Sequence, residues 1–227
     1  MARKHKHLYF EEIGIKFDEW MSDYDVGRRT EAILSAIPLG FTGATLEVGC
    51  GTGAITRGIA PLLGDLTVSD ISEALSRTTS EKYGCKWTAE DATQLSFEDC
   101  TFDLVVSSEC IEHTPNPKKC ISEMLRVLKP EGILILTTPN RLWWPVVRLS
   151  QILKIRRFQG NEYFLSPRQV SAEVAGHDAE IIFKTGCHLF PWHFTPLQPL
   201  LKRIDKFGKR LYPLMINQVV VARRLSS

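Results

Sequence analysis

Short apolar runs alternate with amphipathic stretches through the middle of the chain, over residues 43–139. The apolar runs predict strands at residues 44–50, 66–71, 85–91, 102–109 and 132–138. The stretches between them have helical spacing and predict helices at residues 54–63, 72–83 and 117–129. This strand–helix alternation predicts an α/β fold with a doubly wound, mostly parallel sheet covered by helices on both faces.

The flanking segments follow other patterns. Residues 8–40 predict two helices, residues 141–165 look like an insertion, and residues 179–186 and 216–224 predict two late strands. We therefore expect one domain over residues 1–227, in four parts: N-terminal helices at 1–40, a core at 41–140, the insertion at 141–165, and a helix with the last strands at 166–227.

The helix before the late strands has clear end signals. Ser166 is placed as its N-cap, Pro167 and Gln169 stand in its first turn, and Gly176 follows its end. This pattern predicts a helix that begins at Pro167.

The composition is that of an ordinary globular chain: 227 residues, 44% hydrophobic and 24% charged. No segment reaches the roughly 18 consecutive apolar residues that a membrane-spanning helix needs. The first residues show no apolar region of a signal peptide. The six cysteines are scattered without a C-x-x-C pair, which favours free thiols over a zinc site or a disulfide framework. We therefore expect a cytoplasmic protein.

Charge is distributed unevenly along the chain. Residues 1–130 carry 14 Lys and Arg against 20 Asp and Glu, a net −6, whereas residues 131–227 carry 14 against 6, a net +8. Such asymmetry indicates an anionic partner for the basic half, such as a membrane surface, a nucleic acid or an acidic substrate. A solvated basic face is the alternative.

The sequence "EVGCGTG", residues 47–53, follows the first predicted strand. Its G-x-G-x-G spacing differs from the dinucleotide-binding G-x-G-x-x-G, and an acid, Glu47, precedes the first glycine. An acid there is unfavourable beside a pyrophosphate but suits a ligand with a positively charged amino group. Glycines let the backbone approach a ligand closely, and the N-terminus of the following helix favours a carboxylate.

Asp70 ends the next predicted strand, 21 residues after Gly49. In nucleotide-binding α/β folds an acid at this place accepts hydrogen bonds from ribose hydroxyls. An amino group, a carboxylate and a ribose in one ligand describe S-adenosylmethionine, which we expect as the cofactor.

Four segments in this order extend the pattern: "LEVGCGTG", "VSDIS", "AEDATQLSFEDCTFDLVVSSECIEH" and "MLRVLKPEGILILTTPN". They resemble the class I S-adenosylmethionine-dependent methyltransferases of the type 11 branch, closely over residues 29–140 and loosely elsewhere. The resemblance implies a Rossmann-like, seven-stranded sheet, in which the late strands form an antiparallel hairpin and the last strand is antiparallel.

The resemblance also implies roles for individual residues. It places the following residues at the cofactor: Arg29, Glu47, Gly49, Cys50, Gly51, Gly53, Asp70, Ile71, Asp91, Ala92 and Ser108. The glycine-loop residues and Ser108 would line its methionine part, Asp70 its ribose, and Ile71, Asp91 and Ala92 its adenine. Arg29 matches an arginine that reaches the cofactor in the ubiquinone-pathway relatives.

The segment E-x-x-E-H, with Glu109, Glu112 and His113, follows the fourth predicted strand. Substrates bind at the carboxyl ends of strands in such sheets. If the segment turns helically, the three side chains share a face and could hold a divalent cation such as Mg²⁺, which would lower the pKa of a bound hydroxyl. Without metal, His113 could itself be the general base, with Glu112 beside it.

Two groups of relatives resemble this segment. In the ubiquinone-pathway O-methyltransferases an E-x-x-E-H run followed by P-x-P stands here, as in "ECIEHTPNP". In the plant-type small-RNA terminal 2′-O-methyltransferases a similar run binds metal, and "TPN" follows the fifth strand, as Thr138-Pro139-Asn140 does in this chain. The glycine loop and the residues after the fifth strand depart from the ubiquinone-pathway pattern, so the exact substrate does not carry over.

The insertion after the fifth predicted strand combines basic and apolar residues and contains no acid over residues 140–158. Trp143, Trp144 and several aliphatics alternate with arginines and a lysine, a mixture typical of a helix that lies in a membrane interface. We expect either peripheral membrane contact through residues 141–158 or a lid over the substrate. His188, Trp192 and His193 could close the substrate pocket, or form a structural loop.

These features favour a methyltransferase that uses S-adenosylmethionine on a small, apolar or lipid-linked acceptor, at oxygen. An RNA terminal 2′-O-methyltransferase with an E-x-x-E-H metal site is the alternative from another class. Nucleic acid is disfavoured as a partner because no separate RNA-binding module is present and the tryptophans stand among aliphatic residues. A non-catalytic cofactor-binding module is the third hypothesis.

Overall fold

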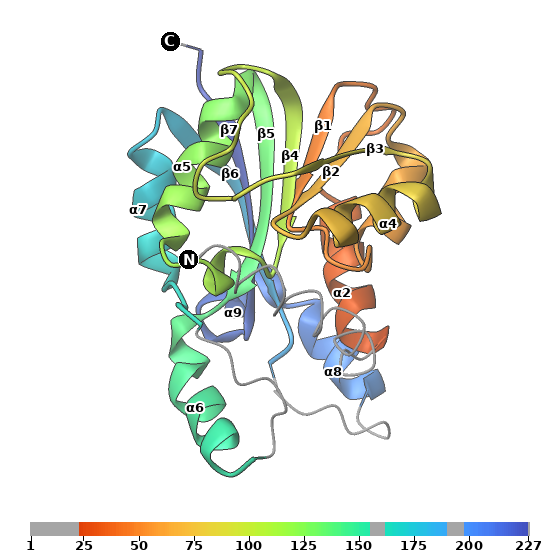
Figure 1. Cartoon of the computed structure of the whole chain (residues 1–227). Helices are drawn as coiled ribbons and strands as arrows, with labels where there is room; N and C mark the ends of the chain where they lie inside the picture. Colours follow the sequence, from red (N-terminus) through yellow and green to blue (C-terminus); the bar gives the residue numbers. More distant parts are fainter. Residues whose placement is uncertain (1–22, 155–161, 190–197, 227) are drawn as a thin grey trace.

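The computed structural model describes residues 23–154, 162–189 and 198–226. Within them a sheet of seven strands has the order β3-β2-β1-β4-β5-β7-β6 (Figure 1). The strands are β1 (Thr45–Val48), β2 (Leu66–Asp70), β3 (Lys86–Ala89), β4 (Phe102–Ser108), β5 (Leu128–Pro139), β6 (Ala179–Cys187) and β7 (Asn217–Arg224). β1 to β5 pair in parallel, and β7 is antiparallel to both β5 and β6. The predicted fold class is confirmed.

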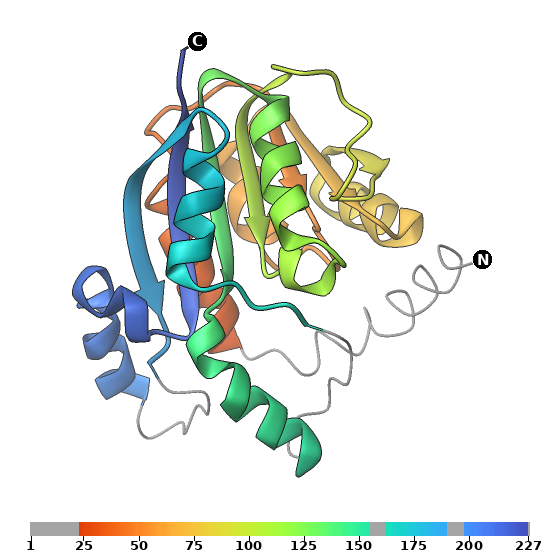
Figure 2. The same cartoon turned by 90° about the vertical axis from the view of Figure 1, so that its left-hand side faces the viewer.

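Helices cover both faces of this sheet. The longer helices are α2 (Asp23–Leu34), α4 (Glu73–Tyr83), α5 (Pro117–Val127), α6 (Trp144–Ile152), α7 (Pro167–Ala175) and α8 (Gln198–Asp205). The shorter ones are α3 (Thr56–Ile59), α9 (Gly208–Leu211) and the 3₁₀ turns η1 (Ala60–Leu62), η2 (Ile111–His113), η3 (Arg141–Trp143) and η5 (Tyr212–Leu214). Figure 2 shows α5 and α7 together on the face opposite α2.

Each face has its own apolar core. Met124 of α5 and Val170 of α7 pack with Leu134 of β5 in one cluster, and all three are fully buried. Ile33 of α2 and Ile59 of α3 pack with other strand residues in the second cluster. Because the central strands are buried on both faces, their polar groups reach solvent or ligand only at the strand ends.

The predicted helix ends are largely confirmed. Ser72 caps α4, where its side chain accepts from Leu75 N, and Ser166 forms a capping box with Gln169 at the start of α7. The stretch 54–63 differs from the prediction: α3 has four residues and gives way to η1, whose first turn contains Pro61. Proline cannot donate the backbone hydrogen bond that continues an α-helix, which is consistent with this break.

The insertion forms η3 and α6, which extend from the carboxyl end of β5 away from the sheet (Figures 1 and 2). Residues 155–158 of the expected membrane contact, and the helix expected before residue 23, lie outside the described residues. Of the helices that the structure describes, none combines the length and apolarity needed to cross a bilayer.

Candidate active site

One cavity at the carboxyl ends of β1, β2 and β4 brings most of the predicted site residues together. Its lining includes Arg29, Glu47, Gly49, Cys50, Gly51, Asp70, Ile71, Asp91, Ala92, Ser108, Glu109 and His113. Gly53 and Glu112 stand outside the lining. Residues from six segments between α2 and η2 therefore meet at one place, which is the strand edge where ligands bind in such folds.

The glycine loop joins β1 to α3. Gly49 has φ +77°, and a Cβ at this position would lie 2.3 Å from Cys110 Sγ, so a larger residue would be both strained and in collision. Gly53 has φ +85°, and its absent Cβ leaves room for the Tyr83 ring. Gly49 thus lets the loop pack against Cys110, while Gly53 lets it pack against α4.

Asp70, the last residue of β2, is held by two backbone donors. Gly51 N donates to its Oδ2 at 3.0 Å and Ser72 N to its Oδ1 at 2.9 Å. These bonds fix the carboxylate at the cavity wall between the glycine loop and α4. The carboxylate lines the cavity, where carboxylate oxygens can accept from hydroxyl groups of a ligand.

Glu47 stands on β1 below the glycine loop and is only 3% exposed. Its Oε2 accepts from Thr56 Oγ1 at 2.7 Å. The pKa of this carboxyl is raised to about 8, chiefly by burial; the hydrogen bond from Thr56 lowers it and the nearby charge of Asp70 raises it. A cationic group in the cavity would favour the ionised form.

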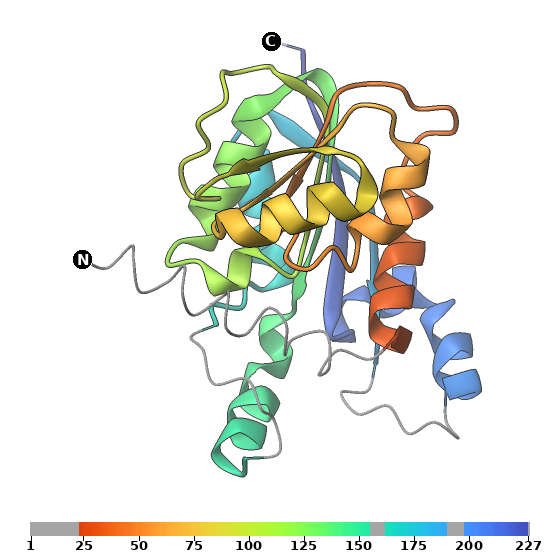
Figure 3. The ribbon, with the colours of Figure 1, turned by 45° about the vertical axis from the view of Figure 1, so that its right-hand side comes forward.

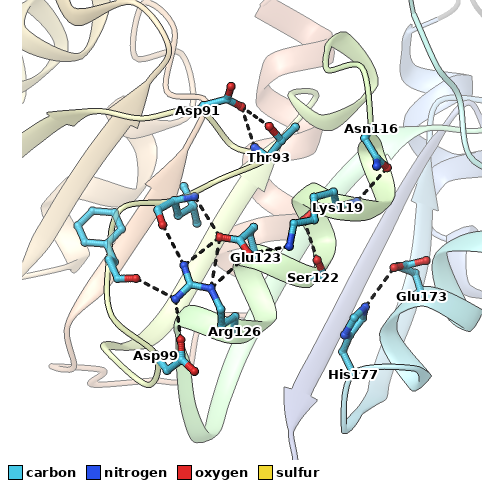
Figure 4. Close-up of polar contacts among 12 residues, drawn as sticks. Asp91, Thr93, Asp99, Asn116, Lys119, Ser122, Glu123, Arg126, Glu173 and His177 are labelled. Carbon is cyan, nitrogen blue, oxygen red and sulfur yellow. Dashed lines mark hydrogen bonds and ion pairs between the residues drawn. The ribbon is translucent and has the colours of Figure 1, made fainter.

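The loop after β3 carries Asp91 and Ala92. Thr93 donates to Asp91 Oδ1 from both N (2.9 Å) and Oγ1 (2.6 Å), which leaves Oδ2 for a ligand donor (Figure 4). Farther along the loop, Arg126 of α5 donates to the carbonyl oxygens of two loop residues, Leu95 (2.9 Å) and Phe97 (2.8 Å). This clamp holds the loop, and with it the cavity wall, against α5.

The E-x-x-E-H segment is not a continuous helix. Glu109 follows β4 with φ +52°, a conformation uncommon for a residue with a side chain. Its Oε1 accepts from Thr137 Oγ1 at 2.9 Å and its Oε2 from Asn217 Nδ2 at 2.7 Å, and Arg29 Nη1 lies 3.7 Å from Oε2. Glu109 is therefore held by side chains of β5, β7 and α2.

Glu112 and His113 lie in η2, one turn later. Glu112 is 1% exposed and its Oε2 accepts from Thr138 Oγ1 at 3.2 Å. Burial, followed by the charge of Glu109, raises the pKa of Glu112 well above its usual range. His113 lines the cavity, and its Nε2 lies 4.0 Å from Glu112 Oε1.

The divalent cation expected at Glu109, Glu112 and His113 does not fit this arrangement. The expected shared helical face is absent, because Glu109 precedes η2 and its carboxylate is engaged by β5 and β7. Among the described residues, no group of three or more His, Cys, Asp or Glu is arranged to hold a metal ion.

Several cavity residues gave no signal in the sequence. Cys110, Thr114 and Pro115 of the η2 region line the cavity beside His113. Asn217, which holds Glu109, stands 108 residues away on β7. A lone asparagine at the start of a strand has no local pattern, and only the antiparallel register of β5 and β7 brings it to the site.

Comparison with known families gives the cavity a chemical context. The family model described as a methyltransferase domain, type 11, matches residues 46–136, the segment that contains the glycine loop, Asp70, Asp91 and His113. The chain belongs to the class I S-adenosylmethionine-dependent methyltransferases. In this family S-adenosylmethionine is the methyl donor.

Individual relatives of this methyltransferase are distant. An uncharacterized protein of Methanocaldococcus jannaschii is 27% identical over 202 residues, covering 88% of this chain and 89% of its own. The ubiquinone biosynthesis O-methyltransferase of Photobacterium profundum is 28% identical over 160 residues, covering 64% of this chain and 67% of its own. A solved complex of the Trm112 methyltransferase activator and a methyltransferase from Haloferax volcanii has a chain with the same fold, with a TM-score of 0.74 at 14% identity and coverage of 96% and 98%.

Proposed function

We propose that this methyltransferase transfers the methyl group to an oxygen atom of a small, apolar or lipid-linked acceptor, with His113 as general base. The observation that carries the proposal is that His113 lines the same cavity as the glycine loop and Asp70. The similarity to ubiquinone biosynthesis O-methyltransferases supports oxygen as the accepting atom.

Different residues of the cavity bind different parts of the cofactor. Glu47 meets the amino group, Arg29 the carboxylate, Asp70 the ribose hydroxyls, and Asp91 the adenine. When bound, S-adenosylmethionine supplies an electrophilic methyl group on sulfur. By holding the cofactor in one position, the cavity removes much of the entropic cost of in-line attack on the methyl group.

His113 completes the reaction by taking the proton of the acceptor hydroxyl. A positioned general base contributes typically 10²–10⁴-fold to such a step. Burial raises the pKa of Glu112 well above its usual range, which disfavours a negative charge beside the His113 ring.

The insertion provides the surface for an apolar or lipid-linked acceptor. Its exposed apolar side chains are Leu142, Trp144, Leu149, Ile152 and Leu153, and its cations within the described residues are Arg141, Arg148 and Lys154. Basic residues beside exposed Trp and Leu suit an anionic lipid interface. We place peripheral membrane contact on residues 141–158, at the same end of the sheet as the cavity.

The test is methyl transfer to a panel of hydroxylated aromatics and lipid extracts, with S-adenosylhomocysteine release as the readout. His113→Ala is expected to lower turnover about 100-fold or more while cofactor affinity changes little. An equal loss of cofactor affinity would remove the catalytic role of His113. Methylation of nitrogen only, or of RNA with steeply salt-dependent binding, would replace the proposed acceptor.

Liposome flotation tests the membrane contact separately. Vesicles with anionic lipid should bind the protein more strongly than neutral vesicles, and Trp144→Ala with Arg148→Gln should reduce this binding. Lys86→Gln, which removes an exposed cation at the far edge strand β3, is the matched control. Equal binding to neutral and anionic vesicles would contradict the electrostatic part of the assignment.

A further inference from the structure

A buried polar chain connects the end of β6 with the cavity. His188 follows β6, is 6% exposed and has φ +62°. Its ring Nδ1 lies 2.9 Å from Asn217 Oδ1, and Asn217 Nδ2 donates to Glu109 Oε2 at 2.7 Å. Glu109 in turn lies 3.7 Å from Arg29 and lines the cavity.

The hydrogen-bond chemistry fixes the direction of this chain. The amide NH₂ of Asn217 donates to Glu109, so its oxygen faces His188. The oxygen of Asn217 requires a donor, so His188 carries a proton on Nδ1. Each member thus orients the next, from the imidazole to the amide and from the amide to the carboxylate.

The far side of His188 is tied to helices outside the sheet. Its Nε2 lies 3.4 Å from Asp25 Oδ1 of α2, and its backbone N donates to Asp205 Oδ1 of α8 at 3.0 Å. Asp205 also accepts from Arg28 Nε of α2 at 2.9 Å, and α2 and α8 lie side by side (Figure 3). His188 therefore stands where α2, which carries Arg29, is joined to the end of the sheet.

Two members of this hydrogen-bonded series, His188 and Glu109, are among the six non-glycine residues with positive φ in the described part of the protein. Such conformations cost about 1–3 kcal/mol each and persist where the surroundings fix them, often at functional sites. Here the two residues with positive φ, His188 and Glu109, stand on either side of Asn217 in the hydrogen-bonded series. The strain therefore coincides with the residues that would need an exact orientation toward the cavity.

We propose that His188 is a positioning residue for the methionyl end of the cofactor. Through Asn217 it orients Glu109, and Glu109 holds the Arg29 guanidinium toward the cavity. This inference rests on the proposed role of Arg29 at the cofactor carboxylate. His188 itself does not line the cavity among the described residues, so its effect reaches the ligand through Asn217, Glu109 and Arg29.

Two ligands separate this role from a general loss of structure. S-adenosylhomocysteine carries the amino-acid end, whereas 5′-methylthioadenosine has the same nucleoside without the carboxylate. Calorimetric titration of His188→Ala should show about 5- to 10-fold weaker binding of S-adenosylhomocysteine, the loss expected for one misplaced polar contact, and less than about twofold change for 5′-methylthioadenosine.

Conservative variants sharpen the test. His188→Asn places an amide donor near the position of Nδ1 and tolerates positive φ, so it should restore most of the affinity for S-adenosylhomocysteine. His188→Gln places its donor near Nε2 and should not. His177→Ala changes an exposed histidine on the far side of α7 and serves as the matched control.

The outcomes distinguish failure of the positioning role of His188 from failure of the cofactor site. Equal losses for both ligands in His188→Ala, unchanged affinity in that variant, or no recovery in His188→Asn would each overturn the positioning role while leaving the methyltransferase site in place. Failure of the unmodified protein to bind S-adenosylhomocysteine would overturn the cofactor site itself, and the positioning role with it.

Discussion

The buried carboxyl of Glu47 should make the stability of the fold depend on pH. In the folded protein its pKa rises from an ordinary 4.5 to about 8, chiefly because the group is buried. A raised pKa means that the folded state binds the proton more tightly than the unfolded chain does. The contribution of Glu47 to the free energy of unfolding is therefore complete below about pH 4.5, and it is lost as pH rises through about 8.

The size of the effect follows from the same two values. Each pKa unit corresponds to about 1.4 kcal/mol, so ionising Glu47 inside the fold costs on the order of 5 kcal/mol. Glu47→Gln keeps the shape and an acceptor for Thr56 but removes the titration. The free energy of unfolding of the variant should match that of the unmodified protein near pH 4.5 and exceed it by several kcal/mol above pH 8.

Urea unfolding followed by circular dichroism between pH 5 and 9, without ligand, measures this difference. Glu98→Gln, at an exposed acid in the loop before β4, is the matched control and should leave the pH profile unchanged. Parallel profiles for Glu47→Gln and the unmodified protein would refute the burial argument. With cofactor, the cationic amino group should displace the proton of Glu47, so binding near pH 7 should release a proton that Glu47→Gln does not release.

Three further substitutions test separate parts of the site. Asp70→Ala should weaken S-adenosylhomocysteine about 10- to 100-fold, because a charged acceptor for ribose is lost; unchanged affinity by calorimetry would refute the ribose assignment. Gly49→Ala should lower the free energy of unfolding by about 1–3 kcal/mol, because its Cβ would meet Cys110 Sγ, and a neutral result in urea would contradict this packing. Ser166→Ala should cost about 1 kcal/mol in thermal unfolding through the lost helix cap; an unchanged midpoint would show that the cap contributes nothing.

Local patterns in the sequence were enough to predict the sheet and the glycine-loop side of the cavity. Several predicted site residues lie within a few residues of strand ends: Glu47, Gly49, Asp70 and His113. Predicting where each strand ends therefore already places them at one edge of the sheet. Parallel strands bring their carboxyl ends together, and this geometry needs no knowledge of side-chain packing. The loop with Asp91 follows the same rule after β3.

The side of the cavity near Glu109 could not be predicted in the same way, because its contacts depend on the register between strands that are far apart in the sequence. The helical face expected for the E-x-x-E-H segment failed because Glu109 adopts positive φ to reach Thr137 and Asn217. Asn217 reaches it only because β7 runs antiparallel beside β5, with Pro139 opposite Asn217. No sequence period encodes that pairing.

This difference has a chemical consequence for the site. An E-x-x-E-H helix with both carboxylates on one face would gather negative charge and attract a cation. In the structure, Glu109 is satisfied by Arg29, Thr137 and Asn217, while Glu112 is buried with a raised pKa. Hydrogen bonds and a guanidinium therefore already offset the charge of Glu109, and burial disfavours a charge on Glu112. This arrangement supports the proposed role of His113, rather than a metal ion, in taking the proton of the acceptor.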